Sequence, residues 1–286
     1  MTAFATPGPS ATNLAGPAKV LVCDALAKSG LDALRGLGCI VMNDPELGEA
    51  TLARAVKDTG PDVLITGNTP ISAEVIEASP RLAMIVVAGT SADHVDIAAA
   101  SRRGIFVANC PGRNATAVAE LAWALILACD RRIPEQTAAL RAGQWRQREF
   151  AQAVGLHGRT LGIVGLGQVG QEVAQIGRAF GMDVIAWSRN LTEEKALEHG
   201  CGFCASLINL AKLSDVVSIS AGGGEDSDNL INEKFLAALK PGAILVNTSR
   251  GGVIDQAALS NAVRTRGLRA GLDVWANEPE GADDAF

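Results

Sequence analysis

The 286-residue sequence has no apolar run long enough to cross a membrane and no basic leader segment. Its longest apolar stretch, Ala117–Cys129, contains Glu120 and is shorter than the roughly 20 residues that a membrane-spanning helix needs. The first 18 residues are rich in Pro, Ala, Thr and Ser, and no cationic side chain precedes Lys19, which excludes a secretory signal and a transit peptide. We therefore expect a soluble, cytoplasmic protein with a disordered tail over residues 1–18.

The sequence also lacks an excess of positive charge. It has 25 Lys and Arg residues against 31 Asp and Glu residues, which gives a formal net charge of -6. Proteins that bind nucleic acids usually present a basic face to the phosphates. A short basic cluster, Arg264, Arg266 and Arg269, is interpreted as the solvated end of a helix. The charge therefore argues against a nucleic acid as the main partner.

Metal-ligand spacing is absent as well. Two of the six cysteines, Cys201 and Cys204, form a CxxC pair, but no second Cys or His pair lies at the spacing of a zinc site. The pair does not open a helix as a redox motif would, and most cysteines lie in apolar patterns, as expected of reduced cytosolic thiols. We predict no metal site and interpret the CxxC spacing as incidental.

The most informative pattern present is a glycine-rich turn after a short apolar run. Thr160–Val164 leads directly into Gly165-Leu-Gly-Gln-Val-Gly170, which has the spacing GxGxxG. In a dinucleotide-binding unit the first glycine permits a tight turn, the second lets the pyrophosphate approach the backbone, and the third lets helix and strand pack closely. A helical pattern and a second predicted strand, Asp183–Trp187, come after it. The pattern predicts a Rossmann unit that binds phosphates at a helix N-terminus.

Before this unit, short apolar runs alternate with helical patterns from Lys19 onward. The predicted strands are Lys19–Asp24, Cys39–Asn43, Val63–Gly67, Met84–Gly89 and Ile105–Cys110. The predicted helices are Leu31–Leu37, Leu52–Lys57, Ala73–Ala78 and Val95–Arg103. Such alternation is typical of a parallel α/β sheet. We therefore expect a first α/β domain over residues 19–110.

A second domain is predicted over residues 111–286. Pro111 and Gly112 break the first pattern, and a long helix, expected to act as the hinge element, is predicted from Ala115 to Cys129. The segment Asp130–Leu156 is expected to be an irregular arm that packs on another surface, with a partner subunit as the candidate. The fingerprint strand forms a second doubly wound sheet with strands predicted near Asp183, Val216, Ala243 and Arg269.

Two strand ends in this second sheet carry charged side chains. The strand Ala243–Thr248 leads to Arg250, at the edge where ligands of open α/β sheets bind. The guanidinium of Arg250 suits a carboxylate, although a surface arginine is the alternative. Asp273 ends another predicted strand, and Glu278 lies just beyond it. From the residues alone, Asp273 is as compatible with capping a turn as with touching a ligand.

In this order, these motifs resemble those of the D-isomer-specific 2-hydroxyacid dehydrogenases, in particular the branch that includes D-3-phosphoglycerate dehydrogenase. The resemblance runs from Lys19 to the C-terminus. It includes Asp93–Asp96, Asn109–Asn114, Ala117–Glu120, Asp130–Pro134 and Gly158–Gly167. The resemblance implies a fold of two doubly wound parallel-sheet domains, a flavodoxin-like substrate domain and a Rossmann cofactor domain.

The resemblance also implies roles for the candidate residues. Arg250 would hold the substrate carboxylate and polarise the keto oxygen, Asp273 would contact the nicotinamide carboxamide, and Glu278 would orient a catalytic histidine and raise its pKa. The loop Gly89-Thr90-Ser91 would offer backbone N–H groups to the carboxylate, and the long helix with its arm would form a homodimer. The expected cofactor-binding residues are Gly165, Gly167, Gln168, Val169, Gly170, Ser188, Arg189, Thr248, Ser249 and Asp273.

The sequence departs from the family at the general acid. The family's catalytic histidine lies downstream of the Glu-Pro motif, beyond Phe286 where this sequence stops, so we expect a C-terminally truncated fragment or a gene product that ends early. Three histidines remain. His199 is expected to cap a helix, and His157 and His94 are expected to be structural rather than catalytic.

A second departure concerns the cofactor. NAD-preferring members carry an acidic residue for the ribose 2′-OH after the second Rossmann strand, and this sequence has Ser188 followed by Arg189. A hydroxyl and a guanidinium suit a 2′-phosphate, so NADP is favoured over NAD. The alternative is that Arg189 points into solvent and the site accepts either cofactor.

The third departure concerns the substrate. The loop Thr66–Ile71 lacks the arginine that phosphoglycerate-type members use for the substrate phosphate, and Ser220–Gly224 replaces a Pro-containing segment. We hypothesise an oxidoreductase that transfers a hydride between NAD(P) and a small D-2-hydroxy or 2-keto acid of the phosphoglycerate, hydroxypyruvate or glyoxylate type, the last two being easier to accommodate. The alternative is a catalytically inactive nucleotide-binding sensor or inactive subunit. A Rossmann reductase of another family fits worst, because its fingerprint would normally lie near the N-terminus.

Overall fold

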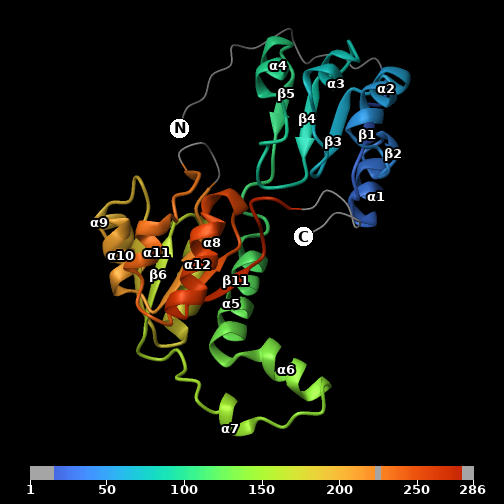
Figure 1. Cartoon of the computed structure of the whole chain (residues 1–286). Coiled ribbons are helices and arrows are strands. Elements are labelled where there is room, and N and C mark those ends of the chain that lie inside the picture. Colours follow the sequence, from blue (N-terminus) through green and yellow to red (C-terminus); the bar gives the residue numbers. More distant parts are fainter. Residues whose placement is uncertain (1–15, 223–226, 279–286) are drawn as a thin grey trace. The chain divides into compact units, whose positions relative to one another are not determined.

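Residues 16–222 and 227–278 are described by the computed structural model, and chain contacts divide it into two units, Met1–Arg113 and Asn114–Phe286 (Figure 1). The tail expected over residues 1–18 lies outside the described residues except for its last three positions, and so do Gly223 and Gly224 of the Ser220–Gly224 segment. Within the described residues, no helix is long and apolar enough to cross a membrane.

The first unit contains a five-stranded parallel sheet in the order β2-β1-β3-β4-β5. Its strands are β1 Lys19–Val22, β2 Ile40–Asn43, β3 Val63–Thr66, β4 Met84–Val87 and β5 Phe106–Ala108. Its helices are α1 Lys28–Gly36, α2 Glu49–Thr59, α3 Ala73–Glu77 and α4 Ile97–Arg102. The strand order is that of flavodoxin-like sheets, so the predicted fold of this unit is confirmed.

Successive residues of β1, together with Cys23 directly after it, pack alternately in two separate hydrophobic cores. Leu21 and Cys23 pack in the cluster that includes residues of α2, α3 and α4, whereas Val20 and Val22 pack with Leu31 of α1. Because successive side chains of a strand point to opposite faces, this division shows helices on both faces of the sheet. It also explains why the strands are continuous apolar runs in the sequence.

The second unit contains a six-stranded parallel sheet in the order β11-β10-β9-β6-β7-β8. Its strands are β6 Thr160–Val164, β7 Asp183–Trp187, β8 Gly202–Phe203, β9 Val216–Ile219, β10 Ile244–Asn247 and β11 Arg269–Leu272. Its helices are α5 Ala115–Arg131, α6 Ile133–Arg141, α7 Gln147–Phe150, α8 Gln168–Ala179, α9 Glu193–Glu198, α10 Leu207–Leu213, α11 Glu233–Ala238 and α12 Gln256–Arg266, with a 3-10 turn, η2 Gly251–Val253. The predicted second doubly wound sheet is confirmed, and β8, which has only two residues, was not predicted.

The long helix α5 packs on the second sheet rather than standing alone as a linker. Trp123 stacks on Phe180 with ring centroids 4.6 Å apart, and its indole Nε1 donates to the carbonyl of Val173 at 3.2 Å. In the last turn of α5, the Asp130 carboxylate accepts a hydrogen bond from Arg159 at 3.1 Å. The helix is therefore part of the second unit's core.

The basic cluster near the C-terminus of α12 is not simply a solvated helix end, so that interpretation is wrong for two of its three arginines. Arg266 donates to the carbonyls of Leu236 and Leu239. Arg269 donates to the carbonyls of Cys129 at 3.2 Å and Asp130 at 3.4 Å, in the last turn of α5. The two guanidinium groups satisfy carbonyls that helix ends leave without a partner.

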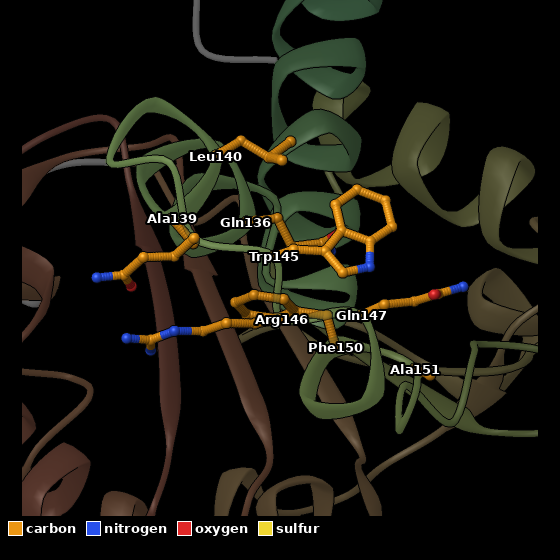
Figure 2. Close-up of a pocket in the computed structure, with 9 residues that line it drawn as sticks. Gln136, Ala139, Leu140, Trp145, Arg146, Gln147, Phe150 and Ala151 are labelled. Atoms are coloured by element: carbon orange, nitrogen blue, oxygen red, sulfur yellow. The ribbon is translucent and has the colours of Figure 1, made fainter.

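The arm over residues 130–156 is more regular than expected, because it contains α6 and α7. Arg132 turns the chain between α5 and α6 with a left-handed φ of 53°. Its guanidinium pairs with Glu135 and Glu149 and lies 4.7 Å from the ring centroid of Phe150. These contacts join two short helices that lie beyond the C-terminal end of α5 in Figure 1. Between them is a pocket of about 240 Å³, whose lining side chains are shown in Figure 2.

Candidate active site

The carboxyl ends of β6 and β9 border a cavity of about 240 Å³ in the second unit. The strand β6 lies between β7 and β9, so the winding of the sheet reverses between β6 and β9. In open α/β sheets, ligands bind at such a switch point. The cavity is lined by Gly165, Gly167, Trp187, Ser188, Arg189, Ser220, Ala221, Gly222, Ser227 and Leu230.

The three glycines of the fingerprint meet three different constraints. Gly165 has a φ of +97°, and a Cβ there would lie 2.7 Å from the carbonyl oxygen of Ser220, so only glycine lets the end of β6 pass this close to the end of β9. A Cβ on Gly170 would overlap the carbonyl oxygen of Gly165. Among the described neighbours of Gly167, none lies within 4 Å of the position that its Cβ would take. The backbone of Gly167 is therefore open to a ligand.

Several hydrogen-bonding groups at the carboxyl ends of β6, β9 and β10 have no partner within the described residues. Helix α8 begins at Gln168 with no side-chain cap, and the first N–H groups of a helix have no partner within the helix. The hydroxyls of Ser220, in the cavity wall, and Thr248, directly after β10, are buried and make no hydrogen bond within the described residues. Because buried polar groups are nearly always bonded, these groups fit a polar ligand such as a dinucleotide.

Ser188 and Arg189, which we expect from the sequence to contact the ribose, follow β7 and both line the cavity. The Arg189 side chain is exposed, yet its Nη2 donates to the hydroxyl of Ser227 at 3.1 Å. Ser227 is only 1% exposed. This hydrogen bond holds the guanidinium against the cavity wall.

The turn that presents Arg250 is built on Asn247, a residue that sequence reasoning missed. The Asn247 side chain is fully buried, its Nδ2 donates to the carbonyl of Arg250 at 3.0 Å, and its Oδ1 accepts from the N–H and the hydroxyl of Ser249. The Arg250 side chain is exposed. A polar residue at the end of an otherwise apolar strand was the signal that could have identified Asn247.

The structure brings Asp273 and Glu278 to the same edge of the sheet as Arg250. The N–H of Asp273 donates to the carbonyl of Asn247 at 3.0 Å, and Glu278 accepts from the N–H of Trp275 at 2.9 Å. A Cβ on Gly251 would overlap the backbone of Trp275, so the segment carrying Glu278 passes directly over the residue after Arg250. Three charged side chains from two neighbouring strand ends therefore share one edge.

In the first unit, the loop Gly89-Thr90-Ser91 is held through its carbonyls. Cys110 N–H donates to the carbonyl of Gly89 at 2.8 Å, and Asn109 Nδ2 donates to the carbonyl of Thr90 at 2.7 Å. Across the described part of the chain, no hydrogen bond is donated by the N–H groups of these three loop residues. Consecutive backbone N–H groups form concavities that bind anions, so the loop has the donors that the sequence interpretation requires.

Each of the three histidines has a structural contact. His199 is the C-cap residue of α9, as predicted, and its carbonyl accepts from Arg178 at 2.7 Å. The ring of His157 packs against Gly181, where a Cβ would lie 2.5 Å from the ring. The carbonyl of His94 accepts from the N–H of Ile71 at 2.8 Å.

The chain matches a known protein family over more than half of its length. Residues 123–286 match the family model described as the D-isomer specific 2-hydroxyacid dehydrogenase, NAD binding domain. The chain is 35% identical to D-3-phosphoglycerate dehydrogenase of Methanocaldococcus jannaschii over 263 residues, covering 91% of this chain and 49% of the relative. It therefore spans about half the length of the phosphoglycerate dehydrogenases that it matches.

A shorter relative is covered more fully. The glyoxylate reductase of Thermococcus litoralis is 39% identical over 233 residues, which cover 79% of this chain and 70% of the relative. Among solved structures, an acyclic imino acid reductase (Bsp5) in complex with NADPH and D-Arg is 30% identical with a TM-score of 0.80, covering 92% of this chain and 85% of that one.

Proposed function

Because this chain belongs to the D-isomer-specific 2-hydroxyacid dehydrogenase family, we propose that it transfers a hydride between a nicotinamide dinucleotide and a small D-2-hydroxy or 2-keto acid. The observation that carries the proposal is the cavity at the switch point of the second sheet, with Arg250, Asp273 and Glu278 at the same carboxyl edge. The dinucleotide supplies the hydride, and the protein supplies binding, orientation and charge.

In this proposal each of the three charged residues has a separate role in binding or catalysis. Arg250 binds the substrate carboxylate and polarises the keto oxygen, since its planar set of donors matches a carboxylate. Asp273 contacts the carboxamide of the nicotinamide. Glu278 orients the histidine that protonates the developing alkoxide and raises its pKa; in the family that histidine follows the Glu-Pro motif.

We propose NADP as the preferred cofactor. The guanidinium of Arg189, held by Ser227, and the hydroxyl of Ser188 lie in the cavity wall after β7, where a 2′-phosphate would lie. The solved relative that carries NADPH has 30% sequence identity to this chain. The hydrogen bond between Arg189 and Ser227 is the feature that supports NADP over NAD.

We propose an unphosphorylated substrate such as glyoxylate or hydroxypyruvate. The loop after β3 has no arginine for a substrate phosphate, and a relative of which this chain covers 70% is named a glyoxylate reductase. Phosphoglycerate is the less favoured substrate, although the relatives of greater length carry that name.

We also propose that the chain acts as a homodimer in the cytoplasm. The arm exposes large apolar side chains, with Trp145 76%, Leu140 59% and Val154 87% exposed, and a second copy would cover them. Figure 2 shows Leu140 and Trp145 among the side chains that line the pocket of the arm. All six cysteines are unpaired, which suits a reducing compartment.

The test is reduction of glyoxylate and hydroxypyruvate with NADPH or NADH by a chain extended past residue 286 and by its Arg250→Gln variant. We expect Arg250→Gln to lower kcat/KM by about 1,000-fold while leaving the dissociation constant of the cofactor unchanged, since the lost interaction is with the reacting acid. Arg264→Gln, an exposed arginine on α12, is the matched control and should have no effect. An extended chain that binds the cofactor and turns over neither acid would instead support the inactive nucleotide-binding alternative.

A further inference from the structure

Asp24 follows β1 at the switch point of the first unit, where the sheet winds away in both directions through β2 and β3. Its carboxylate accepts five hydrogen bonds from the segment at the end of β3. The donors are the N–H groups of Gly67 at 2.6 Å, Asn68 at 3.2 Å and Thr69 at 3.1 Å, and the hydroxyls of Thr66 at 3.1 Å and Thr69 at 3.0 Å. Every donor lies 42 to 45 residues further along the chain.

Three consecutive N–H groups and two hydroxyls converging on one point form an anion site, and here the anion is a side chain of the protein itself. Burial by itself disfavours the charged carboxylate, but the hydrogen bonds from Gly67, Thr69 and Thr66 outweigh it and hold the pKa of Asp24 below its ordinary value. Asp24 is therefore ionised at neutral pH. The loop after β3 has its donors satisfied internally.

The segment held by Asp24 supports the next loop of the sheet. The carbonyl of Thr66 accepts from the N–H of Ala88 at 2.7 Å, immediately before Gly89. The carbonyl oxygen of Gly67 lies 3.8 Å from the position of a Cβ on Gly89. On its other side Gly89 accepts from the N–H of Cys110. The loop Gly89-Thr90-Ser91 is thus seated between the segment that Asp24 fixes and the end of β5.

We propose that Asp24 is a positioning residue for substrate binding: its carboxylate fixes Gly67–Thr69, and this segment seats Gly89-Thr90-Ser91 so that three open N–H groups receive the substrate carboxylate. The inference rests on the proposed function for the identity of the ligand. Asp24 already binds the N–H groups after β3. The N–H groups that remain open to a ligand are therefore those of Gly89, Thr90 and Ser91, which follow the neighbouring strand β4. Asp24 itself contacts no substrate.

The test compares Asp24→Asn with Asp96→Asn in the chain extended past residue 286, the form that tests the proposed function. Asp96 is a matched carboxylate in the same unit that caps α4 through a single hydrogen bond from Ala99 N–H at 2.8 Å. Asp24→Asn removes the negative charge that strengthens these hydrogen bonds and puts an NH2 group in place of the oxygen that faces the Thr69 hydroxyl, so we expect the KM for glyoxylate to rise about tenfold. The kcat and the dissociation constant of NADPH should stay within about twofold, and Asp96→Asn should leave all three constants unchanged.

Amide hydrogen exchange gives a readout that does not depend on turnover. Ala88 N–H and Cys110 N–H are the bonded amides on either side of the Gly89 loop. Both should exchange faster in Asp24→Asn and at the wild-type rate in Asp96→Asn. Unchanged exchange at both amides, or a KM that does not move, would overturn the proposal.

Two further outcomes are separable. If the extended chain neither reduces glyoxylate nor binds oxamate, the proposed function fails, and exchange at Ala88 and Cys110 still decides whether Asp24 positions the loop. If Asp24→Asn does not fold, Thr69→Val removes one of the five hydrogen bonds and keeps the carboxylate. This variant should raise the KM by about threefold, and no change in the KM would count against the proposal.

Discussion

The two sheets of this chain use the same topological position in opposite ways. In the second unit the first strand, β6, ends in glycines, and a cavity remains between Gly165–Gly167 and Ser220–Gly222. In the first unit the first strand, β1, is followed by Asp24, whose carboxylate bonds to Gly67–Thr69 across the same kind of switch point. In this chain, the switch point of a doubly wound sheet therefore either leaves a cavity for a ligand or is closed by hydrogen bonds within the protein. The residues directly after the first strand decide which of the two occurs.

The physical difference lies in which group satisfies the backbone donors. A glycine turn leading into an uncapped helix leaves N–H groups for an external anion. A carboxylate from the neighbouring strand end supplies the anion from within, so an external anion would have to displace a group with five hydrogen bonds. The first unit is therefore suited to positioning a loop and the second to holding a nucleotide.

Among changes that test this contrast between the two switch points, the largest effect should come from adding one methyl group at the open one. Gly165→Ala places its Cβ 2.7 Å from the Ser220 carbonyl at a φ of +97°, so we expect the dissociation constant of NADPH to rise at least about 100-fold. Gly67→Ala is the matched change at the filled switch point, where the Cβ would lie 3.4 Å from the Asp24 Cβ, an ordinary contact. Titration of both variants by NADPH fluorescence should show a loss only in Gly165→Ala, and equal affinities would refute the contrast.

An intermediate effect is expected where the open site meets the ribose. Arg189→Ala removes the cation in the cavity wall, so the affinity for NADPH should fall about 20-fold while that for NADH changes less than about twofold. Parallel titrations with 2′,5′-ADP and 5′-AMP isolate the 2′-phosphate. An equal loss of affinity for both probes would mean that Arg189 shapes the cavity and does not bind the 2′-phosphate.

The smallest expected effect is a dependence of stability on pH that is caused by one aspartate in each unit. The pKa of Asp24 is held low by the bonds described above; for Asp215, burial is outweighed by Thr160 N–H and Lys240, and its pKa is also low. A folded-state pKa below the unfolded value contributes stability that is present above about pH 4 and is lost as the pH falls through the folded value. Each group is partly exposed, so the loss should be about 1 kcal/mol or less.

Urea unfolding between about pH 7 and about pH 3 measures this dependence. Asp24→Asn should make the free energy of unfolding of the first unit depend less on pH, and Asp215→Asn should do the same for the second unit. If the free energy of unfolding falls with decreasing pH as steeply in both variants as in the wild type, other carboxylates cause the loss of stability in acid.

Local patterns in the sequence predicted much of the fold. The apolar runs identified the strands because both faces of each sheet are buried, and GxGxxG identified the turn because glycine spacing is a local requirement of the backbone. The arm was predicted less well, since α6 and α7 are short and depend on contacts of Arg132 with Glu135, Glu149 and Phe150.

The supporting residues of the site could not be predicted in the same way. Asp24 was interpreted as the last residue of a strand, because its partners lie 42 to 45 residues away. Arg269 was interpreted as part of a solvated helix end, and its partners, Cys129 and Asp130, lie 140 and 139 residues away.

The sequence by itself determined the two doubly wound sheets, the dinucleotide turn and the presence of Arg250 at a strand end, because each depends on residues adjacent in the chain. Only the tertiary structure decided that the switch point of the first unit is filled by Asp24 while that of the second stays open. The reason is that hydrogen-bond donors and acceptors from distant strand ends meet only once the strands are in register, and the same parallel order can leave those donors for a ligand or satisfy them from within.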